Sequence, residues 1–83
     1  MNAGNWYVYI LRCADNSYYT GITNNLKQRI SDHNSGKGAR YTINRRPVEL
    51  IYTEKSPNKS SASKREIEIK DMSRAKKEKL ING

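Results

Sequence analysis

The chain contains a set of tyrosine, arginine, histidine and glutamate residues whose types suit chemistry on a phosphodiester. Two triplets that include tyrosine, residues 7–9 (YVY) and 19–21 (YTG), lie near the N-terminus, and Arg29 and His33 follow them. A later glutamate, Glu66, falls beside Ala62 and Ile69 on a later predicted helix. Hydrolysis of a phosphodiester needs a nucleophile, neutralisation of the phosphate charge and stabilisation of the leaving oxygen. If they converge, these residues form a candidate phosphodiesterase site.

Two predicted strands carry the triplets. Residues 6–12 are rich in aromatic and β-branched side chains and are apolar on both faces, which is typical of a central strand. The polar tract 14–17 has the composition of a turn, and a second strand is expected at about 17–23. We therefore predict an antiparallel hairpin. Gly21 interrupts its second strand. A glycine there marks a bulge or the close approach of another backbone or a ligand, or else a packing accommodation under a helix.

The first predicted helix, over about residues 24–34, carries Arg29 and His33. Leu26, Arg29, Ile30 and His33 recur at the spacing of one helical face. Because Leu26 and Ile30 must define the buried side of this helix, Arg29 and His33 are expected to point toward the sheet. A partly buried arginine needs an anionic or hydrogen-bonding partner.

The second half of the chain predicts one further strand and three helical segments. A connection rich in glycine and arginine spans 35–46, with a short helix at 40–44. A third strand is predicted over 48–53, a long helix follows it, and the basic stretch 74–81 forms the last helix. We expect one domain over residues 1–83, of the α/β (α+β) class. Its three-stranded antiparallel sheet, with the first strand central, is flanked by helices.

The long helix is expected to bring Glu66 to the domain interior. Ala62, Ile69 and Met72 fall on one side of it, with Glu66 beside them. Ser63 and Glu66 also match the spacing of a capping box, which requires the helix to begin late. Glu66 is therefore either an interior carboxylate or a capping or surface ion-pair residue.

Charge points to an anionic partner. Sixteen Lys and Arg against eight Asp and Glu give a net charge of +8. Nucleic acid is the first candidate partner, the alternative being a solubilising surface. The segment 37–46 holds no acidic residue. Its cations and one tyrosine are the predicted nucleic-acid contacts: Lys37, Arg40, Tyr41, Arg45 and Arg46. For Tyr41, packing on the domain is the preferred interpretation over stacking on a base.

The single cysteine and the single histidine limit which other classes of protein the chain can belong to. One cysteine forms no intramolecular disulfide, and one Cys with one His assembles no zinc site, which favours a reduced, cytoplasmic setting. The N-terminus has neither a basic segment nor a long apolar run, so neither a signal peptide nor a membrane span is expected.

The arrangement of these motifs resembles the GIY-YIG nuclease family over nearly the whole chain. Residues 7–9 and 19–21 stand where the two family triplets would be, and Arg29, His33 and Glu66 match the family arginine, histidine and carboxylate. The stretch from His33 through the RYT of residues 40–42 is similar to short bacterial members that consist of little more than the nuclease core. The chain departs from the family in three ways. The first triplet begins with tyrosine instead of glycine, the second has threonine at its centre, and an asparagine after the glutamate helix has no counterpart.

The resemblance implies a metal-dependent endonuclease that hydrolyses DNA phosphodiester bonds, in DNA repair or processing. Glu66 would hold one Mg²⁺ or Mn²⁺ ion, which keeps waters and takes phosphate oxygens as further ligands. Arg29 would bind a phosphate oxygen, or form a structural ion pair with an acid. Tyr9, Tyr19 or His33 would be the base. An ordinary tyrosine titrates near ~10, so a base role requires a nearby cation or metal.

Two other functions fit the same residues. One is a non-catalytic nucleic-acid-binding module that keeps the fold. The other is a nuclease that needs a partner protein for substrate recognition. The tyrosines are also the main aromatic residues available for a core, since the chain has one Trp and no Phe.

Overall fold

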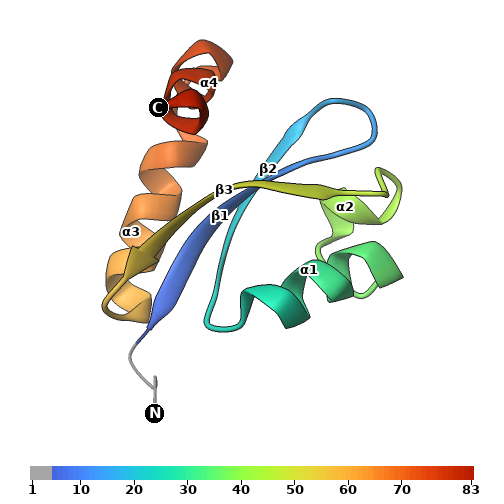
Figure 1. The fold of residues 1–83 in the computed structure, drawn as a ribbon, viewed down its shortest axis with the longest axis horizontal. Helices are drawn as coiled ribbons and strands as arrows, with labels where there is room; N and C mark the ends of the chain where they lie inside the picture. Colours follow the sequence, from blue (N-terminus) through green and yellow to red (C-terminus); the bar gives the residue numbers. More distant parts are fainter. Residues whose placement is uncertain (1–4) are drawn as a thin grey trace.

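The computed structural model describes residues 5–83, and its elements follow the predicted order (Figure 1). Strands and helices form because apolar side chains recur at the matching periods. Their order along the chain is β1 (Trp6–Arg12), β2 (Tyr18–Thr23), α1 (Leu26–Ser35), α2 (Arg40–Ile43), β3 (Glu49–Ser56), α3 (Lys59–Lys70) and α4 (Arg74–Asn82).

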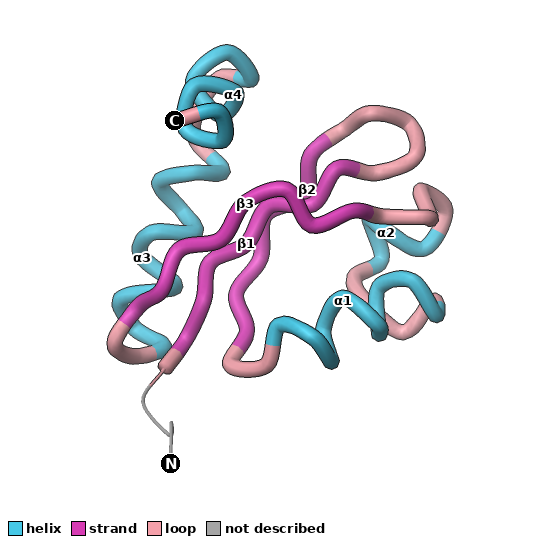
Figure 2. Tube along the Cα trace, viewed as in Figure 1, coloured by secondary structure: helices cyan, strands magenta, loops and turns pink. Residues whose placement is uncertain are grey.

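The sheet has three antiparallel strands in the order β2-β1-β3, which confirms the prediction of a central first strand (Figure 2). Tyr9 lies opposite Gly21 of β2 on one side and opposite Thr53 of β3 on the other. The pairing of β1 with β3 shifts register between Ile10 and Leu11. Tyr9 therefore occupies the middle of the sheet.

The two faces of the sheet bury separate apolar clusters. Val8 and Ile10 pack on one face with Ala62 and Ile69 of α3, all of them fully buried. On the other face, Tyr9 and Leu11 pack with residues of α1 and with Val48. Helices α3 and α4 lie to one side of the sheet and α1 and α2 to the other (Figure 1). The strand that is apolar on both faces is thus covered on both, as its sequence predicted.

The start of α3 corrects one expectation. This helix begins at Lys59, and its N-cap is Asn58, whose side chain accepts a hydrogen bond from the Ser61 backbone N–H at 2.8 Å. Ser63 and Glu66 lie well inside the helix, so the capping-box interpretation of their spacing was wrong. An asparagine cap three residues before its donor satisfies a free N–H of the first turn just as well.

The third strand is longer at its C-terminal end than predicted. It continues to Ser56, which pairs with Trp6. Glu54 and Lys55 do not look like strand residues, but β1 supplies hydrogen-bonding partners opposite both of them. Pairing with β1 therefore outweighs the weak β-strand propensity of these two residues.

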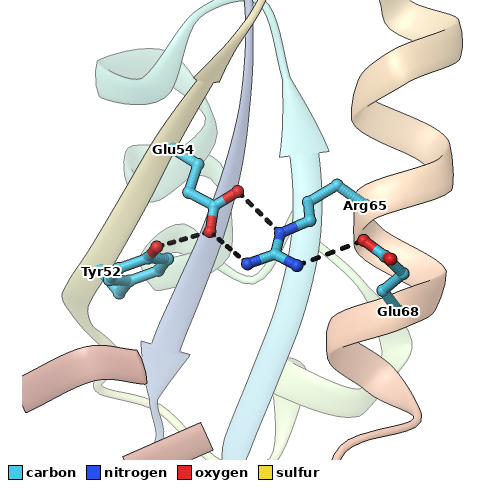
Figure 3. A network of polar contacts seen from close by, with 4 residues as sticks. All are labelled: Tyr52, Glu54, Arg65 and Glu68. Atoms are coloured by element: carbon cyan, nitrogen blue, oxygen red, sulfur yellow. Dashed lines mark hydrogen bonds and ion pairs between the residues drawn. The ribbon is translucent and has the colours of Figure 1, made fainter. Parts of the chain in front are cut away.

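A polar network ties α3 to β3 (Figure 3). Arg65 donates from Nε and from Nη2 to the two carboxylate oxygens of Glu54, both at 2.9 Å, and from Nη1 to Glu68 at 3.2 Å. The hydroxyl of Tyr52 donates to the same Glu54 carboxylate. Only Ala62 and Ile69 of α3 are fully buried, so this planar fork adds a directional contact to a small apolar stripe.

Within residues 5–83, no helix combines the length and the apolar character that crossing a membrane requires.

Candidate active site

Tyr9 lies directly against Gly21 in the centre of the sheet. Its side chain is buried, and a Cβ atom added to Gly21 would lie 2.5 Å from the Tyr9 hydroxyl oxygen and 2.7 Å from the ring carbon that bears it. The glycine therefore leaves the space that the phenol occupies. The β1–β2 register runs through Gly21 without a bulge, and the group that packs there is a side chain and not another backbone, so Gly21 is a packing accommodation, made for the Tyr9 ring.

His33 of α1 is fully buried and is hydrogen-bonded to Tyr9 across 2.9 Å between Nε2 and the hydroxyl oxygen. The predicted orientation of this face of α1 toward the sheet is therefore confirmed for His33. Gly38 packs on the other side of the imidazole, since a Cβ atom at residue 38 would collide with Nδ1 and with the ring. The imidazole is thus held between β1 and the connection that precedes α2.

Thr42 of α2 is the second hydrogen-bonding partner of His33. Its Oγ1 lies 2.8 Å from Nδ1 of the imidazole and 2.9 Å from the carbonyl oxygen of Ala39, to which it donates. Thr42 is fully buried. Sequence reasoning missed both Thr42 and Gly38, because nothing in the local pattern shows that the connection folds back onto α1.

Tyr19 completes an aromatic cluster around the histidine. Its ring centroid lies 5.2 Å from that of His33 and 6.4 Å from that of Tyr9. On its outer side it stacks on Tyr41 at 6.0 Å. Tyr9, Tyr19 and His33 are therefore brought together, as residues of one site must be.

Arg29 is half-buried on α1, in the same surroundings as the two tyrosines. Its nearness to Tyr9 raises the pKa of the guanidinium and lowers the pKa of the phenol. Burial is the larger influence on Tyr9, however, and leaves the pKa of its hydroxyl above the ordinary value. Arg29 alone therefore does not favour a phenolate, and a tyrosine base needs a proton acceptor.

The pKa of His33 is shifted in the direction that suits a proton acceptor. Burial is the main cause that lowers it, the Arg29 cation lowers it further, and Asp32 opposes both. The imidazole is therefore neutral at neutral pH and has one unprotonated ring nitrogen.

Glu66 stands on α3 with a side chain that is 20% exposed, and it forms an ion pair with Lys70 at 3.4 Å. It is close enough to Tyr9 to raise the pKa of the phenol. Among residues 5–83, no three His, Cys, Asp or Glu residues cluster as a metal cage. A single carboxylate fits Mg²⁺ or Mn²⁺ because these ions retain water and take phosphate oxygens as ligands.

The cations predicted to contact nucleic acid divide into two groups. Lys37 and Arg40 are exposed, and Arg46 is exposed although its Nε donates to the Ile43 carbonyl at 2.7 Å. Arg45 forms an ion pair with Asp15 at 3.0 Å and covers the ring of Tyr41 at 4.0 Å. Arg45 is therefore engaged in an ion pair within the domain, whereas the other three are exposed and Arg46 is held by its backbone contact.

The ring of Tyr41 contacts both Tyr19 and the guanidinium of Arg45, and 38% of Tyr41 remains exposed. This geometry agrees with the preferred interpretation that Tyr41 packs on the domain.

Comparison with known proteins gives a family match. The model of the GIY-YIG catalytic domain matches residues 5–79. A UPF0213 protein of Natronomonas pharaonis is 53% identical over 79 residues, which are 95% of this chain and 93% of that protein. A UPF0213 protein of Staphylococcus haemolyticus is 57% identical over 75 residues, which are 90% and 92% of the two chains.

Solved structures agree with the fold. The solution structure of a UPF0213 protein of Bacillus halodurans has 50% identity and a TM-score of 0.61, over 94% of this chain and 83% of that one. A solution structure of a protein from E. faecalis has 42% identity and a TM-score of 0.65 over the same shares.

Proposed function

Because the chain belongs to the GIY-YIG family, whose activity is that of a nuclease, we propose that it is a divalent-metal-dependent endonuclease. Its substrate is DNA, and residues 1–83 act as one nuclease domain in the cytoplasm, in DNA repair or processing. The net charge of +8 supports an anionic substrate.

The observation that carries this proposal is the buried hydrogen bond between Tyr9 and His33, with Arg29 beside it. A phenol bonded to a neutral imidazole can pass on its proton, and the neighbouring guanidinium can neutralise a phosphate. A purely structural aromatic core has no need of a half-buried arginine or of a buried hydrogen bond between a tyrosine and a histidine.

The chemistry then runs through three side chains. A water oxygen attacks the phosphorus and gives its proton to the Tyr9 oxygen, as the Tyr9 proton passes to Nε2 of His33. The bond from phosphorus to the leaving oxygen breaks as the new bond forms, and that oxygen departs with the electron pair and takes a proton from solvent water. Arg29 binds a non-bridging phosphate oxygen and stabilises the charge that develops there. Tyr19 packs beside both reacting side chains and limits the space for the phosphate.

Glu66 is the proposed ligand of one Mg²⁺ or Mn²⁺ ion. When bound, the ion would supply Lewis-acid stabilisation of phosphate and leaving oxygens. Lys70, which pairs with Glu66, must release the carboxylate for this role, and its own half-exposed side chain is free to turn toward solvent when it does.

Phosphate-backbone contacts are assigned to the exposed cations Lys37, Arg40 and Arg46. Lys37 and Arg40 lie within two residues of Gly38, which packs on His33, and Arg46 belongs to the same connection, so DNA bound by these cations would pass next to the proposed site. Such contacts position the substrate without reading its sequence.

The test is cleavage of single-stranded, duplex and branched DNA with Mg²⁺ or Mn²⁺. Wild type is compared with Arg29→Ala and Glu66→Gln, and with Glu68→Gln as a matched control on the exposed side of the same helix. We expect wild type and the control to cleave, and the two site variants to lose at least about 100-fold, the scale of one removed charge-stabilising group.

Other outcomes discriminate between the alternatives. Tight, salt-sensitive binding without products from any variant indicates the non-catalytic binding module. Cleavage that appears only after cell extract is added indicates a nuclease that needs a partner protein. Cleavage that Glu66→Gln and Arg29→Ala retain in full contradicts the proposed site.

A further inference from the structure

Thr42 is the residue that determines which nitrogen of His33 faces Tyr9 without a proton. Its Oγ1 lies 2.9 Å from the Ala39 carbonyl oxygen. This separation is that of an O–H···O hydrogen bond, and the carbonyl has no proton to give, so the threonine hydroxyl is the donor. Thr42 therefore donates its single hydroxyl proton to the Ala39 carbonyl oxygen.

The donors and acceptors of the other hydrogen bonds, from Thr42 to His33 and from His33 to Tyr9, follow from this donation. Oγ1 of Thr42 also lies 2.8 Å from Nδ1 of His33, and with its proton already used it can only accept there. Nδ1 thus carries the imidazole hydrogen. In a neutral ring Nε2 is then bare, so it accepts the hydroxyl proton of Tyr9 across 2.9 Å.

We propose that Thr42 is a positioning residue for the hydrolytic reaction: it holds His33 in the tautomer whose Nε2 takes the Tyr9 proton. This inference rests on the proposed function. Thr42 itself touches no reacting atom. It acts through His33, and the Ala39 carbonyl fixes its hydroxyl in turn.

The opposite tautomer shows why this position matters. With hydrogen on Nε2, the imidazole would donate to the Tyr9 oxygen, and Nδ1 would require a donor that Thr42 has already given to Ala39. The phenol proton would then have no acceptor in this chain of contacts. After the reaction step, by contrast, an imidazolium donates from both nitrogens, and Thr42 still accepts from Nδ1. The same contact therefore serves both protonation states.

The connection before α2 supports this arrangement. Gly38 lies so close to the imidazole that a side chain there would displace it, and Thr42 follows within one turn of that contact. Thr42 is fully buried, so water does not replace its hydroxyl.

The experiment uses the fact that His33 is the only histidine of the chain. The ring ¹⁵N chemical shifts of the folded, uniformly labelled protein therefore report its tautomer without assignment ambiguity. We expect a protonated Nδ1 and an unprotonated Nε2 in wild type. Thr42→Val, which keeps the shape and loses the hydroxyl, should shift the signals toward the other tautomer or a mixture.

Cleavage is measured in parallel. Thr42→Val is expected to lose about 10- to 100-fold in rate, part of the roughly 100- to 10,000-fold that base catalysis supplies. Thr42→Ser keeps the hydroxyl and should restore both the wild-type shifts and most of the rate. Thr20→Val is the matched control, because Thr20 is also buried but lies opposite Ile10, whose side chain packs under α3.

An Nε2-protonated tautomer in wild type overturns the inference, and so do wild-type shifts and rate in a folded Thr42→Val. If Thr42→Val does not fold, the ¹⁵N shifts of the wild type and the shifts and rate of Thr42→Ser still test the proposed role of Thr42. The ¹⁵N readout needs neither DNA nor metal. A wild type that shows the expected tautomer and cleaves no DNA would therefore count against the nuclease and leave the tautomer assignment standing.

Discussion

The phenol of Tyr9 fills the space that the missing side chain of Gly21 leaves on the neighbouring strand. Gly21 is not one of the described glycines with a positive φ, which are Gly36 and Gly83. The backbone conformation at position 21 would therefore tolerate another residue type. The ring of Tyr9 is what requires a glycine there.

Gly21→Ala should accordingly damage the site without abolishing the fold. The new methyl group would have to push the Tyr9 hydroxyl away from His33. We expect cleavage to fall about 100-fold, as for a displacement of about 1 Å at a reacting group. Overpacking should also lower the free energy of unfolding by about 1–3 kcal/mol. Cleavage assays and urea unfolding check both, and an alanine variant with full activity contradicts the assigned role of Tyr9.

The stability of the protein should fall below pH 6.5 because of His33. Its pKa is lowered in the folded chain, mainly by burial, so the unfolded chain binds more protons as the pH drops below the ordinary value of 6.5. The contribution of His33 to the free energy of unfolding then rises with pH through this range. It is fully present above pH 6.5 and is lost as the pH falls below that value.

Urea unfolding of wild type and His33→Gln between pH 7.5 and pH 5 isolates this effect. The difference between the two proteins should shrink as the pH falls. Asp15 and Glu54, whose carboxyl pKa values are lowered, titrate at more acidic pH and are present in both proteins. A constant difference across the range would show that His33 does not titrate in this way.

The Arg65–Glu54 fork should stabilise the protein more than an exposed ion pair of the same residue types. Arg65→Ala leaves the partly buried Glu54 carboxylate without its two N–H donors, and we expect a loss of about 1–3 kcal/mol. Arg12→Ala removes an exposed pair with Glu49 and should cost less than about 1 kcal/mol. Urea unfolding of the two variants side by side tests this order. Equal losses would mean that the fork contributes no more than a surface pair.

Salt dependence should separate the cations that reach the DNA from those that hold the domain. Arg40→Gln removes an exposed cation, and the slope of log K against log salt should fall by about 1. Arg45→Gln should leave the slope nearly unchanged and lower the free energy of unfolding by about 0.5–1 kcal/mol, because Arg45 is bound to Asp15 and Tyr41. Fluorescence anisotropy at several salt concentrations measures the slopes. Equal slopes for the two variants would contradict this division.

The parts of the fold that local patterns determine were predictable from the sequence. The apolar run through Val8 and Ile10 predicted a central strand, and the spacing of Leu26, Ile30 and His33 predicted the buried face of α1. Both signals arise from periodicity, which short segments carry by themselves.

The parts that depend on contacts between distant segments were not predictable. Thr42 matters because the connection around Gly38 folds back against α1, and no local pattern records that return. The ends of β3 depend on the partners that β1 supplies. The Ser63–Glu66 spacing was misleading because Asn58 already caps the helix. Each of these outcomes was decided by a neighbour in space rather than in sequence.

Tyr9 belongs to the one strand of the sheet that is hydrogen-bonded along both edges. Its main chain cannot shift without breaking a ladder, so amide protons of β1 should exchange with solvent only when the whole domain opens. The cations assigned to phosphate contacts, Lys37, Arg40 and Arg46, lie instead on the connection between α1 and β3, outside the sheet. The side chains proposed to contact DNA can therefore move on the surface of that connection, while the main chain that carries Tyr9 stays fixed between its two neighbouring strands.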